Sequence, residues 1–157
     1  MKILKIIAIV VAATVVVAAI GYVTRTDPVL ILAGKRLSGE ESSYPADWSF
    51  TNDYPTVFVE SRPDDPHSVT TSCWLHEGVL YIPAQSGSTK SWTHYVLEDP
   101  RVRIKVGDSV YPARLDRVAQ ENVSRLITSR VEKYPPPADS DPQDAPKDVW
   151  VFRVSDR

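Results

Sequence analysis

The residues best suited to chemistry lie in one short loop, Ser88-Thr89-Lys90. Small side chains with hydroxyl groups can donate hydrogen bonds to an anion, and the ammonium group of Lys90 supplies positive charge. Ser91 is suited to cap a short helix within 87–99, and the positive end of a helix adds to the attraction of an anion. The loop therefore suits a negatively charged group.

A second candidate surface lies on the stretch 67–76, which has the composition of a β-strand and so presents alternate residues on two faces. One face carries His67, Val69, Thr71, Cys73 and Leu75, and the other carries Ser68, Thr70, Ser72, Trp74 and His76. We expect the first face to enter the core, which makes Cys73 a buried packing residue rather than a nucleophile. The second face is either the lining of a ring-shaped ligand or a half-wet outer surface. Trp92 is either a packing residue or a lid over such a ligand.

The three histidines do not predict a metal site. An odd separation places His67 and His76 on opposite faces of a regular strand, and His94 falls on the expected short helix. The sequence Asp64-Asp65-Pro66 is typical of a turn, in which carboxylates bond local amides. Arg101, Arg103 and Lys105 are expected on a solvated strand face, with contact to a phosphate or an acidic head group as the alternative.

Composition excludes several classes of protein. The net charge of −2, from 18 basic and 20 acidic side chains, gives no basic face for nucleic acid. The single cysteine excludes an internal disulfide and a cysteine-rich zinc site. We find no Ser-His-Asp arrangement, phosphate loop or dinucleotide-binding motif, so no catalytic residue can be named.

The N-terminal stretch predicts a membrane anchor over residues 1–23. Ile6 to Val23 is an uncharged run of 18 residues, which as a helix is about 27 Å long against a hydrocarbon core of roughly 30 Å. Lys5 precedes the run and Tyr22 lies at its far end, where aromatic residues favour the interface. A cleaved signal peptide and a buried core helix are the alternatives, but the run is long for the first and apolar all round, which disfavours the second.

The orientation of this anchor is only weakly biased by charge. Lys2 and Lys5 lie on one side, and Arg25, Lys35 and Arg36 lie on the other. We expect the amino terminus in the cytoplasm and the domain outside, with membrane lipid as a partner of the helix.

The rest of the chain predicts a stalk over residues 24–47 and a mainly β domain over residues 48–157. Strands are expected at 56–61, 67–76, 79–86, 101–106, 109–118 and 149–154. Two helices are expected, one within 87–99 that ends before Pro100 and one over 120–134, and a solvated loop is expected over 135–147. Hairpins with a helix between them favour an antiparallel six-stranded barrel.

The stretch 66–118 resembles the split β-barrel of the pyridoxamine-phosphate oxidase and deazaflavin-dependent nitroreductase group. The most specific part is LEDPRVRIKVGDSVYPARLDRV (97–118), since in that group a helix ending in ADPR leads into a strand, a glycine turn and a second strand. The resemblance covers roughly residues 48–118, and VWVFRV (149–154) suits the closing strand of the group.

The resemblance implies FMN or a deazaflavin against the barrel wall. It implies that Ser88, Thr89 and Lys90 hold the phosphate, and we add Thr70, Ser72 and Trp92 as further cofactor-binding candidates. It also implies a homodimer, because the group commonly binds the cofactor between two subunits.

Two functions follow from these observations. The first is a membrane-anchored oxidoreductase that acts on a small or lipophilic acceptor, with the cofactor carrying the hard chemistry. The second is a non-enzymatic binding or assembly module that has lost the cofactor. The second is motivated by two departures from the group, because the arginine-rich strand motif is missing from 67–74 and the glycine-rich basic motif is missing from the chain.

Overall fold

The computed structural model describes residues 2–24, 26–137 and 147–157. The predicted loop at 135–147 therefore lies largely outside the described residues. The elements in chain order are α1 (Lys2–Thr24), β1 (Glu40–Glu41), the 3-10 helix η1 (Ser49–Asp53), β2 (Val57–Ser61), β3 (His67–Thr71), β4 (Trp74–His76), β5 (Val79–Gln85), the 3-10 helix η2 (Gly87–Thr89), α2 (Ser91–Glu98), β6 (Arg101–Val106), β7 (Ser109–Arg117), α3 (Gln120–Lys133) and β8 (Val149–Ser155).

The strands form one curved sheet that does not close, which confirms the predicted mainly β, split-barrel architecture. Hydrogen-bonded neighbours follow the order β3-β2-β6-β7-β8-β5-β4, and all these pairs are antiparallel. The short β1 adds a parallel pair with β7. The predicted count of six strands is wrong, because the described residues form eight. The stretch 67–76 divides into β3 and β4 at Ser72-Cys73, and β1 comes from the segment expected to be a stalk.

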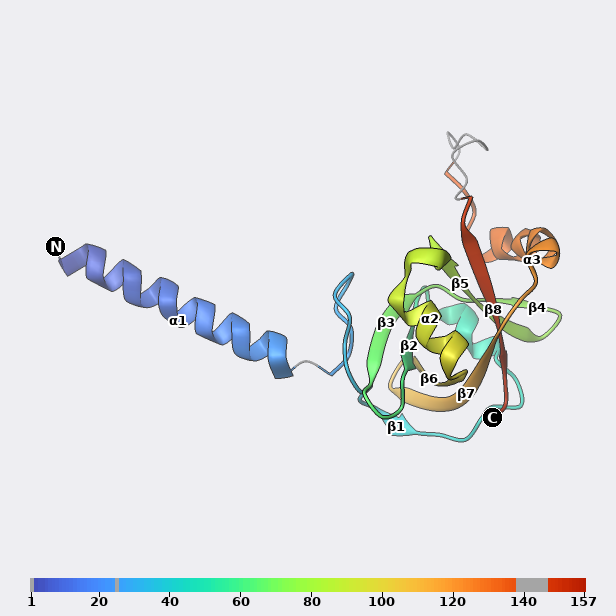
Figure 1. Ribbon diagram of the computed structural model, residues 1–157, viewed down its shortest axis with the longest axis horizontal. Coiled ribbons are helices and arrows are strands. Elements are labelled where there is room, and N and C mark those ends of the chain that lie inside the picture. Colours follow the sequence, from blue (N-terminus) through green and yellow to red (C-terminus); the bar gives the residue numbers. More distant parts are fainter. Residues whose placement is uncertain (1, 25, 138–146) are drawn as a thin grey trace.

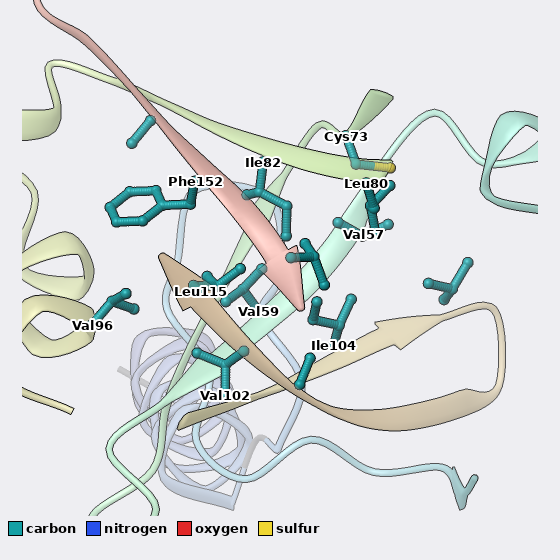
Figure 2. Packing of buried hydrophobic residues seen from close by; sticks show 14 of the residues in the cluster. Val57, Val59, Cys73, Leu80, Ile82, Val96, Val102, Ile104, Leu115 and Phe152 are labelled. Carbon is teal, nitrogen blue, oxygen red and sulfur yellow. The ribbon is translucent and has the colours of Figure 1, made fainter. Parts of the chain in front are cut away.

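The β6–β7 hairpin illustrates how the sequence pattern builds the barrel wall. Val102, Ile104 and Val106 are buried in alternation, as the period of two predicts. Gly107 forms the turn with φ of +59°, a conformation that favours glycine. Figure 2 shows the side chain of Ile104 packed in the core with those of Val59, Leu115 and Phe152.

The helix α2 packs on the barrel and positions the candidate loop that precedes it. The predicted cap at Ser91 is wrong, because Ser91 is the first helical residue and Lys90 occupies the cap position without a side-chain cap bond. The helix ends at Glu98, before Pro100 as predicted, and the amide of Asp99 donates to the carbonyl of Tyr95.

The helix α3 lies on the outside of the sheet against β4 and β8 (Figure 1). Its buried residues Val123 and Leu126 form a second apolar cluster with Trp74. The indole nitrogen of Trp74 also donates to the carbonyl of Leu126 at 3.0 Å, which fixes the helix on the strand. Ile127 and Tyr134 also pack on this cluster, whereas Val131 is 43% exposed.

The segment after α1 lies along the barrel. Gly34 pairs with Ser68 on β3, Leu37 is buried, and β1 pairs with β7. Before these contacts, residues 29–32 form a small apolar hairpin that stands beside β3 (Figure 1).

The segment between α1 and β2, called the lead-in from here on, covers the charged face of β6. The expectation of a solvated face at Arg103 and Lys105 is therefore wrong. Arg103 is 12% exposed and pairs with Glu60 at 2.6 Å and with Glu41. Lys105 is 11% exposed and pairs with Asp27 at 2.5 Å. Burial raises the pKa of Asp27, but the bonds from Lys105 and Ser38 outweigh it and lower the pKa overall. Ion pairs therefore attach the lead-in to the barrel.

The helix α1 extends away from the barrel as a single straight element (Figure 1). Over Ile3–Thr24, a stretch of 22 residues, the mean hydropathy is 2.9 and none of it is buried. By length and composition this helix can span a membrane.

We predict that Arg103→Ala destabilises the fold by about 3 kcal/mol, because Glu60 is 3% exposed and would lose its cationic partner inside the protein. Urea unfolding of the full-length protein in detergent, followed by tryptophan fluorescence, measures this loss. Arg101→Ala is the matched control on the same strand, since Arg101 is 57% exposed and should change stability by less than about 0.5 kcal/mol. Equal losses for the two variants would contradict the structural role of the buried pair.

Candidate functional site

The candidate site begins at the open seam of the barrel, between β3 and β5. Strand β5 pairs with β4 only over Val79–Tyr81, whereas its pairing with β8 continues to Gln85. Pro83 lies in the half without a β4 partner, where its missing N–H costs no ladder bond. The hydroxyl of Thr71 donates to the carbonyl of Pro83 at 3.0 Å and holds the two edges together.

A cavity of about 530 Å³ lies at this seam. That volume is within the range of roughly 300–1,000 Å³ that small-molecule sites occupy. Its lining comes from β3 and β4, from β5, from the start of α2, from α3 and β8, and from the apolar hairpin. The lining residues are Leu30, Ile31, Leu32, Ala33, Val69, Thr70, Thr71, Ser72, Trp74, Pro83, Ala84, Gln85, Lys90, Trp92, Ile127, Arg130 and Val149.

The charge in the cavity has one sign. Lys90 and Arg130 line it, and no Asp or Glu is among its lining residues in the described part of the chain. Arg130 also lies over the ring of Tyr134 at 5.4 Å. An apolar cavity with two cations and no carboxylate is suited to a largely flat or apolar ligand that carries an anionic group.

One buried hydroxyl in the cavity has no partner. The Oγ1 atom of Thr70 is shielded from solvent, and the described residues offer it no hydrogen bond. Its neighbour Thr71 has a bond to Pro83, whereas the buried hydroxyl of Ser68 on the same strand also has no partner among the described residues. A buried polar atom without a partner is unfavourable, and because its surface is shielded, the Thr70 side chain would have to rotate to meet a polar ligand atom in the cavity.

Four of the six predicted cofactor-binding residues lie in this cavity, namely Thr70, Ser72, Lys90 and Trp92. Their role in holding a cofactor stays a prediction. Trp92 is 6% exposed and packs on Phe152 with ring centroids 5.4 Å apart, so it is a core residue that also borders the cavity.

Ser88 and Thr89 are not among the residues that line the cavity, and their hydroxyls are bonded elsewhere. The amide and hydroxyl of Ser88 donate to Asp148 at 3.0 and 2.6 Å, and these bonds lower the pKa of the Asp148 carboxyl. The hydroxyl of Thr89 donates to the carbonyl of Ser86 at 3.0 Å. The hydroxyl pair and Lys90 therefore do not converge on one point.

Sequence reasoning did not identify Arg130 or residues 30–33 as site residues. Arg130 follows Ile127 by one helical turn on α3, so a helical projection could have placed it beside an apolar cavity-lining residue. The apolar run Val29–Ala33 is expected from the sequence either to pack on the domain or to lie at the membrane surface, and in the structure its residues 30–33 line the cavity.

Cys73 and the histidines take structural positions. Cys73 is fully buried, and burial raises the pKa of its thiol, as expected of a packing residue. Burial and the nearby Arg62 lower the pKa of His67, while His76 contacts Ser129 and His94 contacts the carbonyl of Ser88. Within residues 2–24, 26–137 and 147–157, no group of three or more His, Cys, Asp or Glu side chains could hold a metal ion.

We predict that two neighbouring threonines differ in their contribution to stability. Thr71→Val should lower the free energy of unfolding by about 1 kcal/mol, because it removes the hydrogen bond across the seam. Thr70→Val should change the free energy of unfolding by less than about 0.5 kcal/mol or increase it, because it removes a hydroxyl that has no partner. Chemical denaturation of both variants tests this, and a larger loss for Thr70→Val would mean that its hydroxyl is bonded within the protein.

Comparisons with known proteins agree with this architecture. No protein-family model and no curated protein matches the chain. Among solved structures, a conserved hypothetical protein from Mycobacterium tuberculosis is 18% identical with a TM-score of 0.54, covering 69% of this chain and 76% of that one. A candidate 5-nitroimidazole antibiotic resistance protein from Bacteroides thetaiotaomicron is 14% identical with a TM-score of 0.51, covering 68% and 75%. A protein described as a domain-swapped dimer is 24% identical with a TM-score of 0.50, covering 65% and 81%. The open antiparallel barrel and these matches show that the chain has the split β-barrel fold.

Proposed function

We propose that the protein is a membrane-anchored oxidoreductase that binds FMN or a deazaflavin in the seam cavity and acts on a small or lipophilic acceptor. The observation that carries the proposal is the cavity itself, which combines an apolar lining with two cations and the unpartnered Thr70 hydroxyl. The sequence resemblance to the flavin and deazaflavin group supports the choice of cofactor.

The residues of the cavity fit the chemistry of such a cofactor. The phosphate of the cofactor needs cationic donors, which Lys90 and Arg130 supply from two different elements. The flat ring needs apolar walls and a few polar contacts, for which Val69 and Trp92 offer surface and Thr70 and Ser72 offer hydroxyls. Because the hydroxyls of Ser88 and Thr89 are already bonded, we assign the anion to Lys90 and Arg130.

The chain's own part in the reaction is to bind, orient and exclude water. The cofactor, when bound, supplies the electron-transfer chemistry. Trp92 and Trp74 exclude water from the inner wall, since both are almost fully buried. With a cofactor bound, the Thr70 hydroxyl would serve as a polar contact for it, and any volume left open would admit the acceptor.

The helix α1 anchors the protein in a membrane, with the amino terminus in the cytoplasm and the domain outside. Its apolar length of 22 residues is about 33 Å as a helix, enough to cross a hydrocarbon core of roughly 30 Å. A homodimer is part of the proposal on the ground of the sequence resemblance, and sedimentation of the detergent-solubilised protein would reveal a monomer instead.

A non-enzymatic module is the second candidate, and one observation favours it. The Ser88 and Thr89 hydroxyls donate to Asp148 and Ser86, so the loop that resembles a phosphate site already has protein partners for both hydroxyls. In that case the cavity binds a different anionic ligand without electron transfer.

We predict that the full-length protein binds FMN or a deazaflavin, measured by fluorescence titration in detergent. Lys90→Ala and Arg130→Ala should each raise the dissociation constant about tenfold or more, because each removes a charge-assisted contact of about 1.5–3 kcal/mol. Arg125→Ala is the matched control on α3, since Arg125 is exposed and lies outside the cavity lining.

The control separates the cavity from general electrostatic attraction. Equal weakening by Arg125→Ala and Arg130→Ala would place the binding outside the cavity. No binding of either cofactor by the unsubstituted protein would refute the oxidoreductase and leave the non-enzymatic module.

A further inference from the structure

The hairpin Val29–Leu32 is the most unusual surface of the described chain outside α1. Its ends bond to each other, since the amide of Val29 donates to the carbonyl of Leu32 at 3.0 Å and the amide of Leu32 donates to the carbonyl of Val29 at 2.9 Å. All four side chains are apolar and exposed, with Leu30 at 84% and Ile31 at 98%. A cluster of exposed apolar side chains on one protruding turn indicates an interaction surface.

The backbone conformation of the turn also supports an interaction surface. Leu30 has a φ of +53°, a conformation in which glycine is favoured and a large side chain is strained. A bulky apolar residue therefore stands at a position where turn geometry alone favours glycine. Strain of this kind at an exposed site suggests that the side chain has a function there.

The position of the hairpin in the chain identifies its partner. Thr24 ends α1, and Val29 follows after five Cα steps, so the two are no more than roughly 18 Å apart. The base of the hairpin also contacts the end of α1, because the Lys35 ammonium donates to the carbonyl of Val23 at 3.3 Å. If α1 spans the bilayer, the hairpin lies at its surface.

The charges next to the hairpin and its attachment to the barrel also fit a position at the bilayer surface. Lys35 and Arg36, both exposed, follow the hairpin and match anionic head groups. The hairpin is held to the barrel because Gly34 donates to Ser68 at 2.8 Å, and a Cβ at Gly34 would lie 2.5 Å from the Ser68 hydroxyl. The tip therefore keeps a fixed position relative to β3.

We infer that the hairpin Val29–Leu32 inserts its apolar tip into the lipid head-group region and brings the mouth of the seam cavity to the bilayer. Leu30, Ile31 and Leu32 line the cavity as well as being exposed, so one wall of the cavity is a lipid-contact surface. A lipophilic acceptor dissolved in the membrane then reaches the cavity along this wall. The inference rests on the proposed anchoring by α1 and specifies the acceptor class of the proposed function.

The test places an environment-sensitive fluorophore, NBD, on single cysteines of the full-length protein in vesicles of phosphatidylcholine and phosphatidylglycerol. Ile31→Cys reports the hairpin tip, Val16→Cys reports the middle of α1, and Ser124→Cys on α3 is the control for a surface away from the membrane. Cys73 is fully buried, so the unsubstituted protein should label negligibly.

We expect lipid spin-labelled in the head-group region to quench NBD at Ile31 at least twofold more than NBD at Ser124, with a blue-shifted emission at Ile31. Quenching at Val16 by lipid labelled deep in the acyl chain shows that α1 is inserted. Quenching at Val16 with Ile31 equal to Ser124 would overturn the inference and leave the anchor intact. No quenching at Val16 would refute the anchor itself and with it the inference. A blue shift at Ile31 that spin-labelled lipid does not affect would indicate contact with a second copy and would also overturn it.

Discussion

The seam between β3 and β5 is the constraint on which the rest of the structure depends. The interior of the barrel is filled with side chains, as in a closed barrel of this size, but the ladder stops where β4 leaves β5 after Tyr81. The free edges are held by a side-chain bond from Thr71 to Pro83 in place of strand pairing. The seam thereby leaves room for a cavity between two edges that are rigidly built into the sheet on their other sides.

Ion pairs determine the path of the lead-in beside this seam. The lead-in between α1 and β2 is short of apolar contacts, with Leu37 as its main buried hydrophobic residue before Trp48. It is attached to β6 by Asp27 with Lys105 and by Glu41 with Arg103, and Glu60 of β2 pairs with the same arginine and accepts from the amide of Leu37. Burying these charges costs free energy unless they are paired, so each pair fixes the path of the lead-in more than it stabilises the fold. The path places the hairpin 29–32 against one end of the cavity.

Sequence periodicity predicted the barrel because its signals are local. The alternation of Val102, Ile104 and Val106, the turn at Gly107 and the end of α2 before Pro100 each depend on residues close together in the chain. Two errors arose where distant segments meet. The stretch 67–76 has strand composition throughout, but β3 and β4 lie at opposite ends of the strand order, so the chain leaves one edge of the sheet for the other at Ser72-Cys73. Arg103 and Lys105 alternate like a solvated face, and only the lead-in that covers them makes them buried.

Only part of the site was predicted, because local signals identify some of its residues and contacts between distant segments determine the others. Thr70, Ser72, Lys90 and Trp92 were chosen from strand composition, a helix start and a family resemblance, and they line one cavity. Ser88 and Thr89 have the right chemistry, but their hydroxyls bond to Asp148 and Ser86, and Asp148 is sixty residues from Ser88. Arg130 reaches the cavity only because Trp74 docks α3 on the outside of β4, which no local pattern encodes.

The central claim is that the seam cavity is the ligand site, and hydrogen exchange measured by mass spectrometry tests it most directly. With saturating FMN or deazaflavin, the account predicts slower exchange in peptides covering the seam strands β3 and β5 and the start of α2, with the β6–β7 hairpin unchanged. Protection confined to β6–β7, or no change in any peptide under conditions where binding is saturated, would contradict the account.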